Sequence, residues 1–200
     1  KSRMYAFYIG TKKKGTYYVN TNIHDKLNKH ELITLTLHET VPGHHLQLMT
    51  HNRSKKLPLY IQSSHNTGYI EGWGLYCENF TELHTNKEMA WKYIYELQRA
   101  IRLVIDTGIH AFNWSYEKTF QYMKKYLDDS DELLKNEITR YICIPSQALA
   151  YKVGELTILF LRDRYLKLYP DDIKGFHKMI FDIGPCSLDL LVKEFIKKNI

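Results

Sequence analysis

The sequence contains few cysteines, and their spacing excludes two kinds of site. Only three cysteines occur in 200 residues, and no two of them form a C-x-x-C pair. An odd number of widely spaced thiols is not the pattern of a disulfide framework or of a thiolate zinc site. We therefore expect Cys77, Cys143 and Cys186 to be buried as small apolar side chains.

Long apolar segments are also missing from the sequence. It has no run of about 18 apolar residues that could span a membrane, and its N-terminal residues lack the apolar core of a signal peptide. Repeats and low-complexity segments are absent too. From the sequence we expect a soluble, intracellular protein, cytoplasmic or of unknown location, without a membrane partner.

Neither charge sign strongly dominates. The 28 basic and 22 acidic residues give a formal net charge of +6, and the clearest basic runs, at 12–14 and 197–198, are short. Such runs are usually solvated, and no nucleic-acid recognition motif accompanies them, so we expect no nucleic-acid partner. With 44% hydrophobic residues, 200 residues can form a sizeable core, which predicts a single domain over 1–200.

What the sequence does contain is a cluster of metal-ligating residues. His38, Glu39, His44 and His45 lie within eight residues, and Glu71 follows 26 residues after His45. Catalytic zinc often takes two His and one Glu and leaves a fourth position for water. In H-E-x-x-H enzymes the Glu beside the first His takes a proton from that water. The pattern predicts a Zn²⁺ hydrolase with His38 as a ligand and Glu39 as the general base.

The second imidazole does not have the usual spacing. Pro42 occupies the place four residues after His38, and in a straight helix His44 would lie about 120° away from His38 around the axis. Pro42 removes a helical hydrogen bond and Gly43 tolerates unusual dihedrals, so we expect a kink or bulge. We favour His44 as the ligand and His45 as a substrate contact, although spacing separates them only weakly. Alternatively, the Pro-Gly pair ends the helix and the histidines lie on the surface.

The hydrophobic pattern predicts a mainly α fold with a small β edge near the N-terminus. Residues 16–21 are the best strand candidate because they are β-branched and aromatic. Asn28, with Glu31 in a capping box, is expected to begin the helix that carries His38. Asp129 is expected to cap another helix with Glu132. Further helices are predicted at 67–83, 86–109, 147–169, 171–181 and 187–198.

Four segments together resemble one family. TLHETVPGHHLQ, EGWGLYCE, DTGIHAFNWSYE and RYICIPSQALAYKVGELTI are similar, in this order, to the C-terminal half of proteins catalogued as domain of unknown function 885. The resemblance covers about 15–164 and implies a helical metallopeptidase-like domain with a kinked HExxPGHH helix, similar to gluzincin-type zinc peptidases. Two departures are visible, because Ser146 stands where the family usually has Gly and Gly74 where it usually has Ala.

The length of the family implies a missing part. Its members are usually more than twice as long, so we expect the chain to be a fragment or a naturally shortened relative. An N-terminal domain or a partner chain would then complete the cleft.

The third ligand is a choice between two carboxylates seven residues apart. Glu71 and Glu78 share a helix face, and in gluzincin-like enzymes a comparable Glu on a following helix completes the metal site. We therefore prefer Glu71 as the ligand. Glu78 would then orient an imidazole or lie on the surface. We expect Trp73 to serve packing.

Other roles in catalysis and substrate binding are predicted from side-chain chemistry. A tetrahedral oxyanion needs donors besides the metal, for which Tyr151, Lys152 and Arg140 are candidates, Arg140 being suited to a carboxylate. His110 is a candidate catalytic donor, and Asp106, four residues before it on the same predicted helix, is close enough to interact with it directly. Each of these residues has a purely structural alternative. The other histidines, including His51 and His177, show no convergent spacing and are expected at the surface or in linkers.

The strand at 16–21 is a candidate edge for β-augmentation by an extended peptide. It offers Tyr18 and Asn20 as substrate contacts. The alternative is an ordinary hairpin edge.

These observations predict a zinc-dependent hydrolase of peptide or related amide bonds, with a peptide or small amide as substrate. The alternative is a non-catalytic relative. Such a relative would keep the metal for stability, or would bind peptides without cleaving them because part of the cleft is absent.

Overall fold

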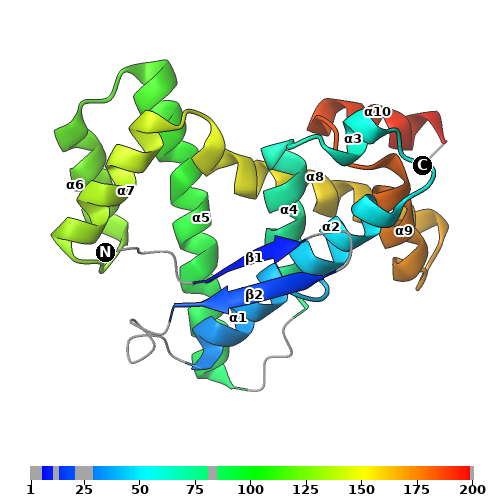
Figure 1. Ribbon diagram of the computed structural model, residues 1–200. Helices are drawn as coiled ribbons and strands as arrows, with labels where there is room; N and C mark the ends of the chain where they lie inside the picture. The colour runs from blue at the N-terminus through cyan, green and yellow to red at the C-terminus, as the bar shows by residue number, and fades with distance from the viewer. Residues whose placement is uncertain (1–5, 11–13, 21–28, 81–84, 199–200) are drawn as a thin grey trace. The chain divides into compact units, whose positions relative to one another are not determined.

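The protein is mainly helical with one small antiparallel sheet near the N-terminus, as predicted (Figure 1). The computed structural model describes residues 6–10, 14–20, 29–80 and 85–198. They group into two compact units, a first unit formed by Lys1–Leu83 with Gly154–Ile200 and a second formed by His84–Val153. Whether the two units form a single domain stays a prediction.

The sheet consists of β1 (Ala6–Gly10) and β2 (Gly15–Val19), with Tyr8 opposite Tyr17. The predicted strand at 16–21 is therefore present but begins and ends earlier. β1 was not predicted, although Ala6–Gly10 has the aromatic and β-branched composition of a strand. β1 contacts both helices of the histidine motif. The proposed cap at Asn28 lies outside the described residues.

The histidine motif interrupts its helix completely. α1 (Lys29–Glu39) ends at Glu39 and α2 (His44–Arg53) begins at His44, with a cis Val41–Pro42 peptide bond between them. The His45 N–H donates to the Thr40 carbonyl, five residues back, at 3.1 Å. The expected kink is thus a break between two helices, because Pro42 cannot supply the hydrogen bond that would continue α1.

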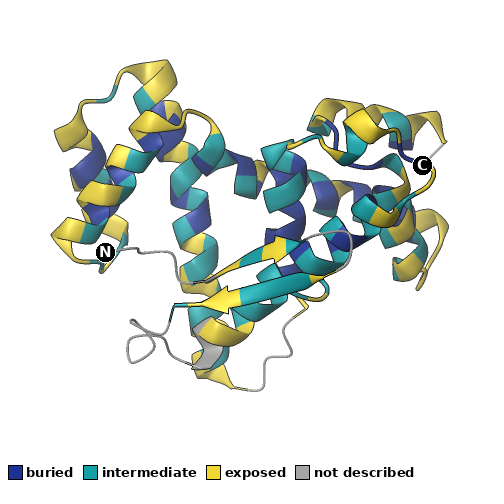
Figure 2. Cartoon of the chain, in the orientation of Figure 1, coloured by how far each residue is buried: buried dark blue, intermediate teal, exposed yellow. Residues whose placement is uncertain are grey.

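α4 (Thr67–Glu78) is the central helix of the first unit. The Asn66 side chain caps it by accepting from the Tyr69 N–H, and most of its residues are buried (Figure 2). A Cβ added at Gly72 would lie 2.5 Å from the Gly154 Cα, so the two backbones approach too closely for larger residues. The helix predicted at 67–83 ends earlier, at Glu78.

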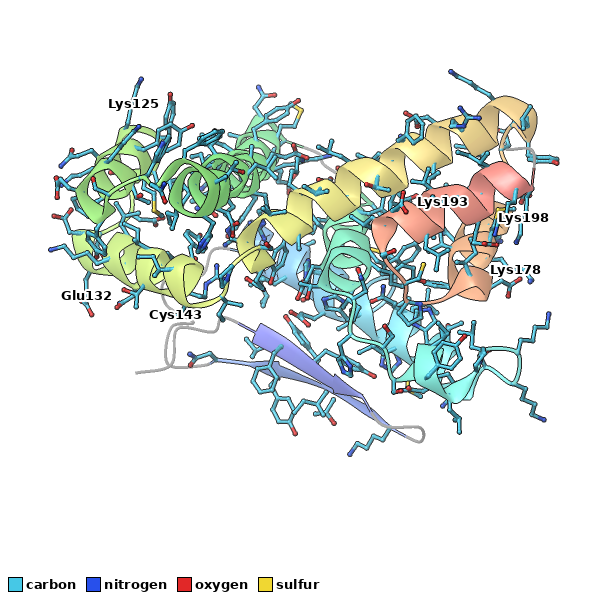
Figure 3. The ribbon with its side chains drawn as sticks, turned by 90° about the horizontal axis from the view of Figure 1, so that it is seen from above. Lys125, Glu132, Cys143, Lys178, Lys193 and Lys198 are labelled. Atoms are coloured by element: carbon cyan, nitrogen blue, oxygen red, sulfur yellow. The ribbon has the colours of Figure 1, made fainter. Side chains whose placement is uncertain are left out.

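The remaining helices of the first unit are α3 (Leu59–Gln62), the part of α8 (Gln147–Leu168) from Gly154 onward, α9 (Ile173–Ile183) and α10 (Leu188–Lys197). Apolar side chains of α4, α8, α9 and α10 form its core, among them Trp73, Tyr76, Ile158, Phe176 and Leu191. The opposite faces of α9 and α10 are charged, and their Lys178 and Lys193 are exposed (Figure 3).

The second unit contains α5 (Asn86–Phe112), α6 (Tyr116–Tyr126), α7 (Asp131–Cys143) and the start of α8. Its core includes Ile101, Ile105, Met123, Leu134 and Ile138. The cap predicted at Asp129 is wrong, because the Ser130 side chain accepts from the Leu133 N–H at the start of α7. Serine is as good a cap as aspartate, and it lies directly before the first helical residue.

The structure tests the expectation that all three cysteines are buried. Cys77 and Cys186 are buried as free thiols, but Cys143 is exposed at the end of α7 (Figure 3), so its predicted burial is wrong. The reason is that the apolar face of α7 carries Leu134, Ile138 and Tyr141 instead.

None of the described helices is long and apolar enough to cross a membrane.

Candidate metal centre

Three helices of the first unit bring two imidazoles and one carboxylate together. His38 lies in the last turn of α1, His44 begins α2, and Glu71 lies in the middle of α4. The Nε2 atoms of His38 and His44 lie 3.4 and 3.5 Å from the same Glu71 Oε2. One ligand atom from each residue can be chosen so that all three lie within 4.8 Å of one another. Among the described residues this group could hold a metal ion.

Two of the three separations are close to those around a tetrahedral cation. With zinc–nitrogen and zinc–oxygen bonds near 2.0 Å and tetrahedral angles, two ligand atoms would be about 3.3 Å apart. The observed 3.4 and 3.5 Å between Glu71 Oε2 and the two imidazole nitrogens are close to this value. The two rings are nearly perpendicular, at 89°, with centroids 4.7 Å apart. The third separation, between ligand nitrogens of the two imidazoles, is at most 4.8 Å.

The second nitrogen of each imidazole is also engaged. Nδ1 of His38 lies 2.8 Å from Glu78 Oε1, and Nδ1 of His44 lies 3.3 Å from Gln47 Oε1. An oxygen at this place accepts the Nδ1–H, which leaves the lone pair on Nε2 for a cation. Glu78 thus occupies the orienting position that was considered for it. Gln47 was not predicted, although its place three residues after His44, one helical turn along, is a local signal.

A glycine and a tryptophan on α4 keep the three helices close. A Cβ at Gly74 would lie 2.7 Å from His38 Nε2 and 3.0 Å from His44 Cε1, so a larger residue there would require the rings to shift. The buried Trp73 donates its indole N–H to the Pro42 carbonyl at 2.9 Å. This bond links the helix break directly to the helix that carries Glu71. Trp73 therefore serves packing and positioning.

The carboxylates dominate the electrostatics of the centre. Burial disfavours a charged His38, but hydrogen bonds with Glu71 and Glu78 outweigh it and raise the pKa of His38 to about 10. Burial likewise disfavours a charged Glu71, but hydrogen bonds with His38 and His44 hold the pKa of Glu71 well below its usual range. A site that stabilises a proton this strongly has the negative potential that a cation requires.

Glu39 lies at the end of α1, beside His38. Burial raises the pKa of Glu39, and the nearby His38 and His44 and a hydrogen bond with the Tyr8 backbone partly offset this effect. A carboxylate with a raised pKa is better suited to taking up a proton and returning it than an exposed one. Glu39 is thus close to the ligand group without belonging to it.

His45 does not belong to the group that could hold a metal ion. Its Nδ1 lies 3.0 Å from the Tyr8 hydroxyl, and the two rings meet edge to face with centroids 5.2 Å apart. The structure therefore separates the roles that spacing left open. His44 joins His38 and Glu71, and His45 is paired with β1.

The other predicted catalytic and substrate-binding side chains of the helical region belong to the second unit. Arg140 donates to Glu137 and to Gln147, and Gln147 donates to the Tyr151 hydroxyl. Lys152 is buried and pairs with Glu96 at 2.9 Å. The structure thus gives these groups partners within their own unit, and their catalytic roles stay predictions.

His110 and Asp106, which were proposed to interact with each other, each have another partner. Nε2 of His110 bonds the Tyr141 carbonyl at 2.9 Å, and the Asp106 carboxylate accepts from the Ser146 N–H. His110 therefore links α5 to α7, and its role as a catalytic donor stays a prediction.

The two residues that were predicted to contact an extended peptide lie in β2 or directly after it. Tyr18 is 46% exposed and stacks on Phe7 of β1, and Asn20 follows the end of β2. Exposed side chains on a short edge strand are compatible with β-augmentation, which stays a prediction.

Two histidines that were expected at the surface lie inside the first unit. His51 is 2% exposed and bonds the Tyr69 hydroxyl at 3.1 Å, so its predicted exposure is wrong. His177 is partly buried beside Trp73 and bonds the Tyr76 hydroxyl at 2.9 Å. Each imidazole is hydrogen-bonded to a tyrosine hydroxyl in place of water. A sequence pattern does not reveal that the fold supplies such a partner.

Comparison with known proteins identifies a family but not an activity. Residues 5–195 match the family described as "Bacterial protein of unknown function (DUF885)". No curated protein matches.

Two solved structures are similar in fold. One, described as a "putative lipoprotein" from Colwellia psychrerythraea, is 31% identical with a TM-score of 0.87, covering 96% of this chain and 35% of that one. The other, a protein of the same description and of unknown function from Shewanella oneidensis, is 22% identical with a TM-score of 0.76, covering 92% and 37%. The chain thus spans little more than a third of the length of these relatives.

Proposed function

Because the chain belongs to a family described only as bacterial proteins of unknown function, we propose its function from the candidate metal centre itself. The proposal is a zinc-dependent hydrolase of peptide or related amide bonds, of the gluzincin-like kind. The convergence of His38, His44 and Glu71, with Glu39 beside them, carries the proposal.

The donor set favours zinc over other common cations. Two imidazoles and one carboxylate suit zinc, whereas calcium and magnesium take mainly oxygen ligands. His38, His44 and Glu71 would hold the ion, while Glu78 and Gln47 orient the two imidazoles. When bound, zinc polarises a carbonyl and lowers the pKa of water.

The chain's own residues supply the proton transfers. Glu39 takes a proton from the water oxygen as that oxygen adds to the substrate carbonyl carbon. It then returns the proton to the amide nitrogen as the carbon–nitrogen bond breaks, so the carboxylate ends as it began. Its raised pKa, due mainly to burial, favours this return.

The rest of the cleft is part of the same proposal. Since the chain spans only 35% and 37% of the two solved relatives, an N-terminal domain or a partner chain would complete the substrate cleft. The peptide or small amide would lie along β2, near Tyr18.

The proposal is tested by separating metal content from turnover. The protein is dialysed against zinc, its bound metal is measured by atomic absorption, and turnover is followed by mass spectrometry on a mixed peptide library. We expect Glu39→Gln to keep one zinc per chain and to lose about 10²- to 10⁴-fold in turnover, because the proton acceptor is gone. His38→Ala should lose the zinc.

A surface variant provides the matched control. Glu132 is exposed on α7 (Figure 3), and Glu132→Gln should keep both zinc and turnover. Full turnover by Glu39→Gln would exclude Glu39 as the base. Stoichiometric zinc in the wild type without any peptide cleavage would favour the non-catalytic, metal-stabilised relative.

A further inference from the structure

Tyr8 of β1 and His45 form a second polar pair beside the candidate metal centre. Tyr8 makes two kinds of contact with the histidine motif, a hydrogen bond from its backbone to Glu39 and one between its hydroxyl and His45 Nδ1 at 3.0 Å. Glu39 ends α1 and His45 lies in the first turn of α2. One strand residue therefore bridges the two sides of the helix break.

The Tyr8 side chain lies in a slot that two glycines leave open. Gly10 and Gly15 face each other at the end of the strand pair. A Cβ at Gly10 would lie 2.5 Å from the Tyr8 hydroxyl, and a Cβ at Gly15 would lie within 2.5 Å of both this hydroxyl and His45 Nδ1. Neither glycine has a positive φ, so space and not backbone conformation requires glycine at these positions. The hydroxyl is thus held in one place.

The direction of this hydrogen bond determines the form of the imidazole. A phenol donates readily to a neutral imidazole nitrogen, and the nitrogen that accepts leaves the ring proton on the other one. When Nδ1 of His45 accepts from Tyr8, the N–H lies on Nε2. Among the described residues no hydrogen bond to His45 Nε2 is present, so an N–H there is available to a ligand.

We propose that Tyr8 is a positioning residue that holds His45 in its Nε2–H form, and that this N–H donates to the carbonyl oxygen of the substrate. The inference deepens the proposed function and rests on it. A tetrahedral oxyanion needs a donor besides the metal, and His45 supplies one that is adjacent in sequence to the ligand His44 and is not itself a ligand.

The tautomer of His45 is tested without any substrate. Long-range proton–nitrogen correlation spectra of the imidazoles, recorded on the full chain with and without zinc, distinguish Nε2–H from Nδ1–H rings. We expect Nε2–H for His45 in the wild type and a mixture of both forms in Tyr8→Phe, which removes only the hydroxyl. An Nδ1–H ring in the wild type would overturn the proposal, whether or not the protein is an enzyme.

The catalytic part is tested by a double-mutant cycle on a peptide that the wild type cleaves. We expect Tyr8→Phe to lower kcat about tenfold with little change in KM, and His45→Leu to lower it about 100-fold, because both act on the donor to the oxyanion. His45→Gln, which can place an amide N–H near the Nε2 position, should recover part of the loss. Tyr8→Phe in the His45→Leu background should cost nothing further.

A control separates positioning from stability. Tyr165→Phe also removes a tyrosine hydroxyl bond of the first unit, the one that Tyr165 donates to Asp172 at 2.8 Å, and it should leave kcat unchanged. All variants should bind one zinc. A wild-type kcat for Tyr8→Phe, or a further tenfold loss in the His45→Leu background, would overturn the proposal. Absence of turnover in a zinc-loaded wild type would instead contradict the proposed function.

Discussion

At the scale of single residues, the candidate metal centre depends on the lack of a side chain at one position of α4. Gly74 has no side chain, and the imidazoles of His38 and His44 occupy the space that a Cβ would need. According to the sequence resemblance, members of the family usually have alanine at this position. This chain therefore has more space there for the two imidazole rings. The spacing of the candidate ligands is therefore sensitive to a single methyl group.

Gly74→Ala is expected to weaken zinc binding. The new Cβ would lie 2.7 Å from His38 Nε2, so the ring must shift by several tenths of an ångström. Displacement of a ligand that its neighbours hold in place costs about 10- to 100-fold in affinity. Competition with a chromophoric chelator measures the change, and Gly68→Ala on the same helix, where the nearest atom is a Leu188 methyl group at 3.0 Å, is the control. Equal affinities would show that the rings do not occupy this space.

Ser146 is the other position where the chain departs from the family pattern. Its φ is +69°, in the left-handed region, while its N–H donates to the buried Asp106 carboxylate. This conformation costs an L-residue about 1–2 kcal/mol, and glycine adopts it freely. The glycine that is usual in the family thus has a conformational reason.

Ser146→Gly is expected to stabilise the protein by up to about 1 kcal/mol, since part of the gain is lost to the greater freedom of glycine in the unfolded chain. Urea unfolding measures the free energy. Ser146→Ala keeps the Cβ and should show no gain. A loss of stability in the glycine variant would contradict this explanation.

At the scale of elements, the first unit is organised around α4. This helix carries Glu71 to the imidazoles, Glu78 to the back of His38 and Trp73 to the helix break, and its glycines allow α8 to approach. The break between α1 and α2 is the other essential feature, because it turns His44 toward His38.

Gly72→Ala is expected to destabilise the first unit. A Cβ there would lie 2.5 Å from the Gly154 backbone, and backbone cannot move aside as a side chain can. Such overpacking costs about 1–3 kcal/mol, more than the roughly 1 kcal/mol that alanine gains over glycine in a helix. Gly68→Ala should be near neutral, since its neighbour is a leucine side chain. Thermal unfolding of both variants measures the difference, and equal melting temperatures would contradict a tight crossing of α4 and α8.

At the scale of the whole molecule, buried histidines make stability depend on pH. Burial lowers the pKa of His51 to about 4, and burial with the nearby Arg162 lowers the pKa of His177 to about 4. The unfolded chain takes up these protons near pH 6.5, before the folded chain does. Their contribution is therefore present above pH 6.5 and is lost as the pH falls toward 4.

We expect the free energy of unfolding to fall between pH 6.5 and 4, with a contribution from each histidine on the order of 3 kcal/mol at most. Urea unfolding at a series of pH values measures it. A double variant, His51→Gln with His177→Gln, should be less stable at pH 7 but flatter in this range. An unchanged slope would show that other groups cause the dependence.

The sequence indicated the residue types of the candidate centre better than the contacts between them. Local patterns were enough for most helices, because caps, periodicity and breakers act over a few residues, and they also indicated the residue types of a zinc site. Where the patterns failed, as at Ser130 and Cys143, neighbouring positions offered chemically similar alternatives.

The amino-acid sequence by itself determined that the chain is mainly helical, that it belongs to its family, and that imidazoles and carboxylates are concentrated around residues 38–45 and 71–78. Only the tertiary structure decided that His44 and not His45 joins His38, that Glu71 meets both rings while Glu78 lies behind one of them, and that Tyr8 bridges the break. The physical reason is that these choices depend on how three helices and a strand pack, and packing is set by contacts between residues that lie 30 to 40 positions apart.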